Sequence, residues 1–73
     1  MTNGEYRVGI DFNPSKSDPV DKIKRLAADL IDLIESLDDG AHLFEVARLK
    51  TLATTSIEQG AMWAVKAATK GKR

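Results

Sequence analysis

Lysine side chains close to aromatic ones are the residues of this chain best suited to ligand chemistry. Lys24 follows Phe12 after a largely polar segment. Lys66 lies three positions after Trp63, and this spacing makes Trp63 and Lys66 neighbours on a helix surface. An ammonium group holds a phosphate, and an aromatic ring stacks on a nucleobase. Both pairs therefore suit an anionic ligand that carries bases.

The first cluster is built around the segment 12–17, FNPSKS. Phe12 offers a ring for stacking, Asn13 an amide that can read a base edge, and Ser15 a hydroxyl. The stem of Lys24 can lie on apolar surface while its ammonium reaches a groove between subunits. The alternative is a turn without any ligand, in which Phe12 is a hydrophobic staple for the helix that follows.

The second cluster is formed by Trp63, Lys66 and Lys70, on adjacent turns near the end of the chain. A binding role is one interpretation. The other is structural: cations near a helix C-terminus complement its dipole, and a tryptophan can anchor the packing.

Residues for catalysis or metal binding are scarce. His42 is the single histidine, it lies beside a turn without an evident partner, and the chain has no cysteine. The acidic segment DDG, 38–40, lacks the alternating oxygen ligands of a calcium site, and the five glycines are too scattered for a phosphate loop. We expect no enzyme activity, no metal and no cofactor.

The length and charge of the chain limit its class. A domain of 73 residues buries a small core, and without disulfides or zinc we expect it to gain support by self-association. Eleven basic and eleven acidic residues cancel, so no overall field attracts DNA. No apolar stretch is long enough to cross a membrane and no signal peptide is evident, which predicts a cytoplasmic protein.

The first long helix is predicted from a cap at Ser17 or Asp18, with Pro19 in its first turn, to a stop at Gly40. Ile31 and a second leucine row widen its apolar surface beyond what one partner helix covers, which indicates an oligomer. Two rows carry this argument: a heptad seam of Val20, Ile23, Ala27, Leu30, Ile34 and Leu37, and beside it Leu26, Leu30, Leu33 and Leu37.

The second long helix is predicted from Ala41 or His42 to about Thr69, long enough to lie antiparallel along the first. Its segment TLATTS, 51–56, places hydroxyl residues in mid-helix, where we expect them to bond back to the preceding turn. The segment GAMWA, 60–64, permits close approach of a second backbone, either within the hairpin or from another subunit.

The N-terminal stretch YRVGIDFNPSK, 6–16, alternates apolar and polar residues as a half-buried strand does. We expect an extended arm over residues 1–16 that a neighbouring subunit orders, with its apolar face on the second leucine row. The chain is then divided into this arm, a helical hairpin domain over 17–70 and a basic tail over 71–73. The fold class is all-α: an antiparallel two-helix hairpin with an extended N-terminal arm, assembled into a homo-oligomer.

The segments FNPSKSDPVDKIKRLAADLIDLI and ARLKTLATTSIEQGAMWAVKAATKG together resemble a family of small bacteriophage hairpin proteins. Proteins of that family sequester the cyclic di- and trinucleotide messengers of CBASS anti-phage immunity without cleaving them. The resemblance covers about residues 12–70 and implies a homohexamer in the host bacterial cytoplasm. Cyclic dinucleotides would bind between protomers, and cyclic trinucleotides would bind at separate sites on the three-fold axes.

The resemblance also implies roles for individual residues. Lys24 falls on the phosphate-contacting lysine and Phe12 on the base-stacking aromatic, with Tyr6 as the second choice for that role. Lys66 falls on the basic residue of the trinucleotide site. The expected dinucleotide site comprises Phe12, Asn13, Ser15, Lys24 and Tyr6, and the expected trinucleotide site comprises Lys66, Ala67, Lys70 and Trp63. The alternative function is a non-catalytic structural or protein-binding hairpin oligomer.

Overall fold

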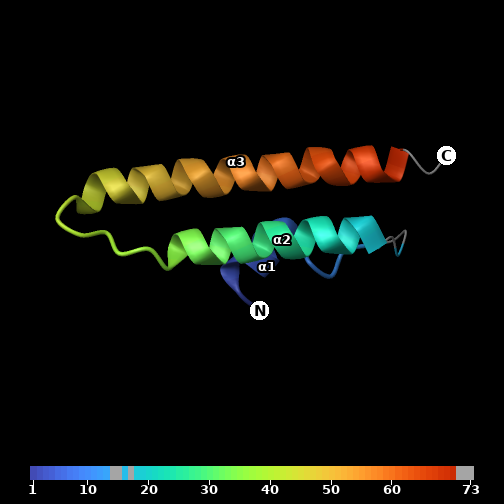
Figure 1. Cartoon of the computed structure of the whole chain (residues 1–73), viewed down its shortest axis with the longest axis horizontal. Coiled ribbons are helices and arrows are strands. Elements are labelled where there is room, and N and C mark those ends of the chain that lie inside the picture. Colours follow the sequence, from blue (N-terminus) through green and yellow to red (C-terminus); the bar gives the residue numbers. More distant parts are fainter. Residues whose placement is uncertain (14–15, 17, 71–73) are drawn as a thin grey trace.

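Three helices make up the fold in a computed structural model of the chain, which describes residues 1–13, 16 and 18–70 (Figure 1). They are α1 (Asn3–Val8), α2 (Asp18–Glu35) and α3 (Leu43–Lys70). Figure 1 shows α2 and α3 side by side, with the chain turning back between them and α1 lying against α2. The described residues contain no strand, which confirms the all-helical prediction.

The end of α2 lies earlier than the sequence predicts. The helix stops at Glu35 rather than near Gly40, and the amide of Leu37 then bonds to the carbonyl of Ile34 at 3.1 Å. The ammonium of Lys50, on α3, donates to carbonyl oxygens at this end of α2. It also pairs with Asp39 at 2.9 Å. A cation from α3 therefore satisfies carbonyl groups that the helix leaves open at its C-terminus.

The start of α2 agrees with the prediction in part. Asp18 is its first residue and Pro19 lies in its first turn, where a proline needs no hydrogen-bonding partner. Ser17, the other predicted cap, lies outside the described residues.

The core of the chain shares Val20 with the predicted seam of α2 but then follows a different row of that helix. The predicted seam residues Leu30 and Leu37 are 45% and 53% exposed, whereas Ile31, expected only to widen the apolar surface, is fully buried. The physical reason is that α1 and α3 both pack against α2, so the most covered line lies between them. The buried side chains of α2 are Val20, Lys24, Ala28 and Ile31, and α3 adds Thr54 and Ala61.

The second leucine row stays uncovered in the single chain, as the sequence argument for an oligomer requires. No segment among residues 1–13, 16 and 18–70 shields it fully, although leucines are among the residues most often buried in folded proteins. We call this set the leucine row; its exposed fractions are Leu26 71%, Leu30 45%, Leu33 60% and Leu37 53%.

The predicted bounds of the second long helix are nearly right, since α3 runs from Leu43 to Lys70. The hydroxyl of Thr51 donates to the carbonyl of Ala47 at 3.1 Å, and that of Thr54 donates to the carbonyl of Thr51 at 3.2 Å. The expectation that these residues bond back to the preceding turn is confirmed for both. Thr54 is also buried against the rest of the fold.

The extended N-terminal arm predicted over residues 1–16 is wrong, because residues 3–8 form a helix. Thr2 and Glu5 make a reciprocal capping box: the Thr2 hydroxyl accepts from the Glu5 amide, and the Glu5 carboxylate accepts from the Thr2 amide. Gly9, at φ 63°, closes the other end in the left-handed conformation. These caps outweigh a period-two alternation that spans only a few residues.

The α1 helix packs on α2 of its own chain. The amide of Gly4 donates to the Asp32 carboxylate at 2.8 Å, and the Asn3 side chain donates to Glu35 at 3.0 Å. Gly4 is buried there, and an added Cβ would overlap the Ala28 carbonyl oxygen and lie 2.6 Å from the Asp32 carboxylate. A glycine at position 4 is what allows the two backbones to meet.

Gly4→Ala is expected to destabilise the fold by about 1–3 kcal/mol, the usual range for overpacking a tight contact. Thermal or urea unfolding measures the effect. Gly60→Ala is the matched control, because a Cβ at Gly60 meets nothing within 4 Å. It should leave the single chain unchanged or stabilise it by up to about 1 kcal/mol. Equal effects of the two substitutions would contradict the α1–α2 contact.

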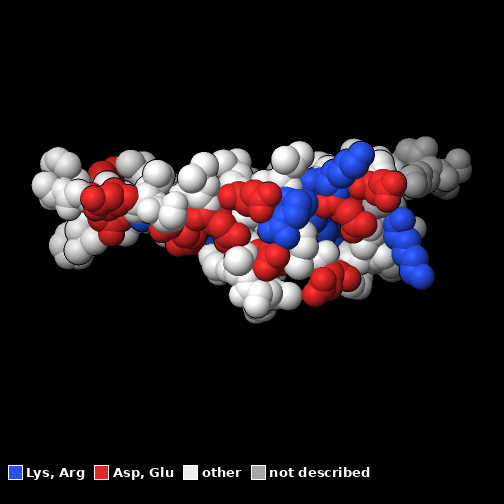
Figure 2. Space-filling model, turned by 60° about the horizontal axis from the view of Figure 1, so that its bottom comes forward, with Lys and Arg blue, Asp and Glu red and all other residues white. Residues whose placement is uncertain are grey.

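Charge is mixed on the face of the molecule that Figure 2 shows. Figure 2 shows acidic and basic side chains interleaved on one face of the molecule, beside uncharged stretches. None of the helices in the described part of the chain combines the length and apolar character needed to cross a membrane.

Candidate ligand-binding site

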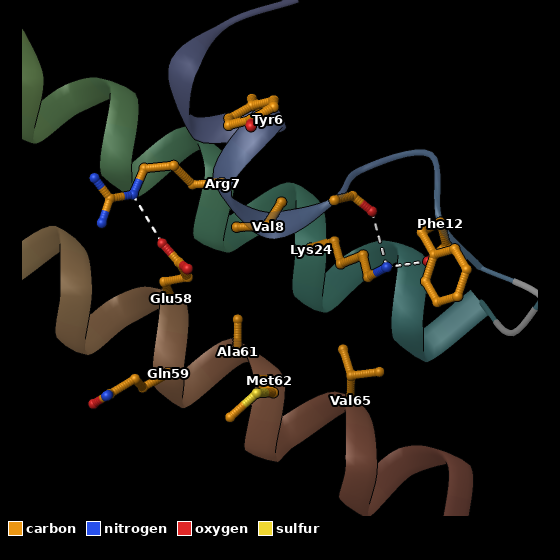
Figure 3. Close-up of a pocket in the computed structure, with 11 residues that line it drawn as sticks. Tyr6, Arg7, Val8, Phe12, Lys24, Glu58, Gln59, Ala61, Met62 and Val65 are labelled. Carbon is orange, nitrogen blue, oxygen red and sulfur yellow. Dashed lines mark hydrogen bonds and ion pairs between the residues drawn. The ribbon is translucent and has the colours of Figure 1, made fainter.

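A cavity of about 460 Å³ lies where α1, the start of α2 and the second half of α3 meet. Figure 3 shows Lys24 and Phe12 at one end of it and Arg7 with Glu58 at the other. Met62 and the neighbouring Val65 of α3 form the facing wall. Its lining thus combines aromatic rings and aliphatic groups with a few charged side chains, as ligand cavities commonly do.

Lys24 is a buried cation in the lining of the cavity. The residue as a whole is only 6% exposed. Its ammonium donates to the Gly9 carbonyl oxygen at 2.9 Å and to the carbonyl oxygen of Phe12, and it lies 5.3 Å from the centre of the Phe12 ring. These partners offset the cost of removing a charge from water. A lysine ammonium has three hydrogens to donate, so two carbonyl bonds leave one for an anion in the cavity.

The same contacts hold the segment that follows α1. The Phe12 amide donates to the Gly9 carbonyl at 2.9 Å, which makes a turn whose two carbonyl oxygens both face Lys24. The lysine therefore ties residues 9–12 to α2 while it lines the cavity. The aromatic rings of Tyr6 and Phe12 are exposed, at 74% and 72%, and are accessible for stacking.

The opposite end of the cavity carries an ion pair that the sequence did not predict. The Arg7 guanidinium donates to the Glu58 carboxylate at 2.9 Å and to the Thr55 hydroxyl at 3.4 Å. Arg7 lies on α1 and Glu58 on α3, so this pair joins the two helices beside the cavity. The two residues are too far apart in the chain for any spacing rule to connect them.

The structure brings together three of the five residues predicted for the dinucleotide site. Lys24, Phe12 and Tyr6 line the cavity. Asn13 does not belong to its lining, since its side-chain amide donates to Asp21 on α2 at 2.7 Å. Ser15 lies outside the described residues.

The residues predicted for the trinucleotide site share one exposed face of α3, away from the cavity. Lys66 lies 5.4 Å from the centre of the Trp63 ring, close enough for a cation–π contact. Trp63 is 60% exposed, so it does not anchor the core of this chain. Positions 63, 66, 67 and 70 follow the helical spacing that aligns side chains, which places Trp63, Lys66, Ala67 and Lys70 on what we call the Trp63 face.

The structure does not gather ionisable groups into a metal site in its described residues. Within the described part of the chain, no three His, Cys, Asp or Glu side chains lie close enough to hold a metal ion. His42 is exposed just before α3, and its carbonyl accepts the first helical hydrogen bond from Val46 at 2.9 Å.

The Glu5–Arg25 ion pair predicts a pH dependence of stability. The Arg25 guanidinium donates to Glu5 at 2.8 Å, and this bond, aided by the Thr2 amide, lowers the pKa of Glu5 from 4.5 to about 2. A carboxyl group with a lowered folded-state pKa stabilises the fold above its unfolded value and loses that effect as the pH falls. Wild type should therefore exceed Glu5→Gln in melting temperature above about pH 4.5 and lose this advantage towards pH 2. A difference that does not change with pH would contradict the pair.

Comparison with family models matches residues 4–69 to the family described as Acb2/Tad1, hairpin domain. The match includes most of α1, all of α2 and nearly all of α3, and with them the described cavity and the Trp63 face apart from Lys70. No curated protein and no solved structure matches the chain.

Proposed function

Because this chain belongs to the Acb2/Tad1 hairpin domain family, which is the anti-CBASS sponge family, we propose that it binds and sequesters cyclic oligonucleotides without cleaving them. Its ligands would be the cyclic di- and trinucleotide messengers of CBASS immunity, and it would act in the cytoplasm of a bacterium infected by a phage. The effector that these messengers activate would then remain inactive.

The observation that supports this proposal best is the position of Lys24 in the cavity. Its ammonium lies beside the Phe12 ring, and the exposed Tyr6 ring lines the same cavity. A phosphate bound by the ammonium would place the attached nucleoside near these rings, where stacking contributes about 1–3 kcal/mol per base. The combination of one buried cation and two accessible rings suits a small nucleotide better than a peptide.

We further propose that the functional unit is a homohexamer in which the cavity is completed by a second protomer. The leucine row is exposed in the single chain, and a second copy of the same surface would bury it. The leucine row and Lys24 lie on opposite faces of α2, so it is a second interface, with its two-fold axis beside the cavity, that would present Lys24 twice. A cyclic dinucleotide has two phosphates related by near-symmetry, so it matches a site with two equivalent lysines.

The Trp63 face is our candidate for the cyclic trinucleotide site. Trp63 provides an exposed ring, and Lys66 and Lys70 provide two ammonium groups on neighbouring turns. Around a three-fold axis, three copies of Lys66 would face the three phosphates of such a ligand. Ala67 leaves room between them for the ring of the ligand.

Isothermal titration calorimetry with 3′,5′-linked cyclic di- and trinucleotides tests the proposal directly. Each titration should show saturable binding, and denaturing the complex should release ligand of unchanged mass. A ligand that returns hydrolysed would contradict sequestration without cleavage. Absence of heat with every cyclic di- and trinucleotide tested would contradict the function itself.

A second candidate function is a structural or protein-binding hairpin oligomer. The leucine row favours it, because an exposed apolar strip suits a protein partner as well as a second copy of the chain. This function makes no use of the Lys24 ammonium, so its loss would leave such a role unchanged.

A further inference from the structure

The α1 helix is too short to hold its place unaided. It has six residues, and isolated helices of that length are not stable in water. Its position on α2 is fixed on one side by Gly4, whose amide bonds to Asp32, and by Glu5, which pairs with Arg25. These contacts lie on the α2 side of the helix and do not set its distance from α3.

Arg7 supplies the polar contacts that the structure gives between α1 and α3 in the described residues. It donates to Glu58 and to Thr55, and its side chain is largely covered at 26% exposure. Figure 3 shows this pair at one end of the cavity while Lys24 and Phe12 stand at the other. Polar contacts therefore hold both ends of the cavity wall formed by α1 and the segment after it. Lys24 makes those at one end and Arg7 those at the other.

The wall between these two ties carries the groups that would meet a ligand. Tyr6 precedes Arg7 on α1, and Gly9, whose carbonyl accepts from Lys24, follows two residues later. A shift of α1 away from α3 would move the Tyr6 ring and the Gly9 carbonyl together. It would also change the direction in which the Lys24 ammonium points.

We propose that Arg7 and Glu58 are positioning residues for the nucleotide site: their ion pair holds α1 against α3 and so preorganises Tyr6, Gly9 and Lys24 for the ligand. The inference rests on the proposed function, since it takes a cyclic dinucleotide as the ligand. A preorganised site loses less conformational freedom on binding, and the pair therefore slows ligand release. Arg7 acts through α1 and needs no contact of its own with the ligand.

The test combines charge reversal with charge exchange. Arg7→Glu should speed dissociation of a cyclic dinucleotide such as cyclic di-AMP about five- to tenfold, measured by surface plasmon resonance, while the association rate changes little. The exchanged variant Arg7→Glu/Glu58→Arg should recover most of the wild-type dissociation rate. Arg48→Glu, which breaks the Arg48–Glu45 pair elsewhere on α3, is the matched control and should bind as wild type does.

Amide hydrogen exchange without ligand separates positioning from general stability. The Gly9 and Ile10 amides donate to carbonyls of α1 at 3.2 and 3.0 Å and report on its C-terminal end. Arg7→Glu should speed exchange at these two amides and leave the centres of α2 and α3 protected. Faster exchange throughout the molecule, with a matching fall in melting temperature, would assign the pair a merely structural role and overturn the proposal.

The remaining outcomes are distinct. Fast dissociation that charge exchange fails to restore would indicate direct contact between Arg7 and the ligand, and so overturn the positioning role. If Arg7→Glu binds and releases the cyclic dinucleotide with the same rate constants as the wild type, this inference alone would be overturned. A wild-type protein that binds no cyclic nucleotide would overturn the proposed function instead, and the inference with it.

Discussion

Lys24→Met is expected to weaken cyclic dinucleotide binding by about 100-fold or more. Each hydrogen bond from an ammonium to a phosphate is worth about 1.5–3 kcal/mol, and the proposed two-fold site loses two of them. Methionine keeps an unbranched stem of similar length but also removes the hydrogen bonds to the Gly9 and Phe12 carbonyls, so the melting temperature of the variant is measured alongside its affinity. Titration calorimetry of wild type and variant under the same salt conditions measures the loss, because screening affects ion contacts.

Lys22→Met is the matched control for this prediction. Lys22 lies on the same helix two positions earlier but does not line the cavity, and its side chain is exposed. The Lys22→Met substitution removes the same charge and should change the affinity for the cyclic dinucleotide by less than about threefold. Equal losses in the two variants would reduce the role of Lys24 to a general attraction for anions. An unaffected Lys24→Met variant that remains folded would favour the protein-binding hairpin.

Leu30→Glu is expected to dissociate the proposed hexamer. Leu30 lies in the middle of the leucine row, and burying one leucine side chain contributes about 1.5–3 kcal/mol in each subunit. A carboxylate at the same place would instead have to leave water without a partner, which is strongly unfavourable. Sedimentation velocity should show the wild type as an assembly and the variant as monomers. Cyclic dinucleotide affinity should fall with the assembly, since the second protomer completes the site.

Thr51→Glu adds the same charge at an exposed position of α3 and serves as the control. It should sediment as wild type does. If Leu30→Glu stays assembled, the leucine row is not the interface that holds the proposed hexamer together. The circular dichroism of both variants should match that of the wild type, because neither position is buried in the single chain.

The long helices could be predicted from the sequence because their signals are repeated over many residues. Apolar positions recur through α2 and α3, and Asp18 with Pro19 marks where α2 begins. The end of α2 could not be predicted, because the carbonyl groups beyond Glu35 are satisfied by Lys50 from another helix. Such a contact depends on how α2 and α3 lie together, and no local pattern reports it.

The alternation of Tyr6, Val8 and Ile10 predicts a strand for the N-terminal segment, but the caps of the segment favour a helix and prevail. The signal for the helix was present: Thr2 and Glu5 have the spacing of a capping box, and Gly9 follows at the C-terminal end. In a segment of this length the terminal residues are the stronger evidence.

The site was predictable in its chemistry but not in its construction. Lys24 and Phe12 could be singled out because a cation and a ring suit a nucleotide, Tyr6 came only from the family resemblance, and all three line one cavity. The wall from α3 and the Arg7–Glu58 pair could not be found, since they arise from packing between distant segments. The buried position of Lys24 has the same origin: the turn at Gly9–Phe12 folds over it.

Native mass spectrometry tests the central claim most directly, using the purified protein alone and with a mixture of cyclic di- and trinucleotides. We predict a hexamer that gains discrete ligand masses, with ligand of unchanged mass after denaturation. The number of ligands of each kind would also separate the Lys24 cavity from the Trp63 face. An assembly that takes up no cyclic nucleotide would contradict sequestration, and the leucine row would then be assigned to a protein partner.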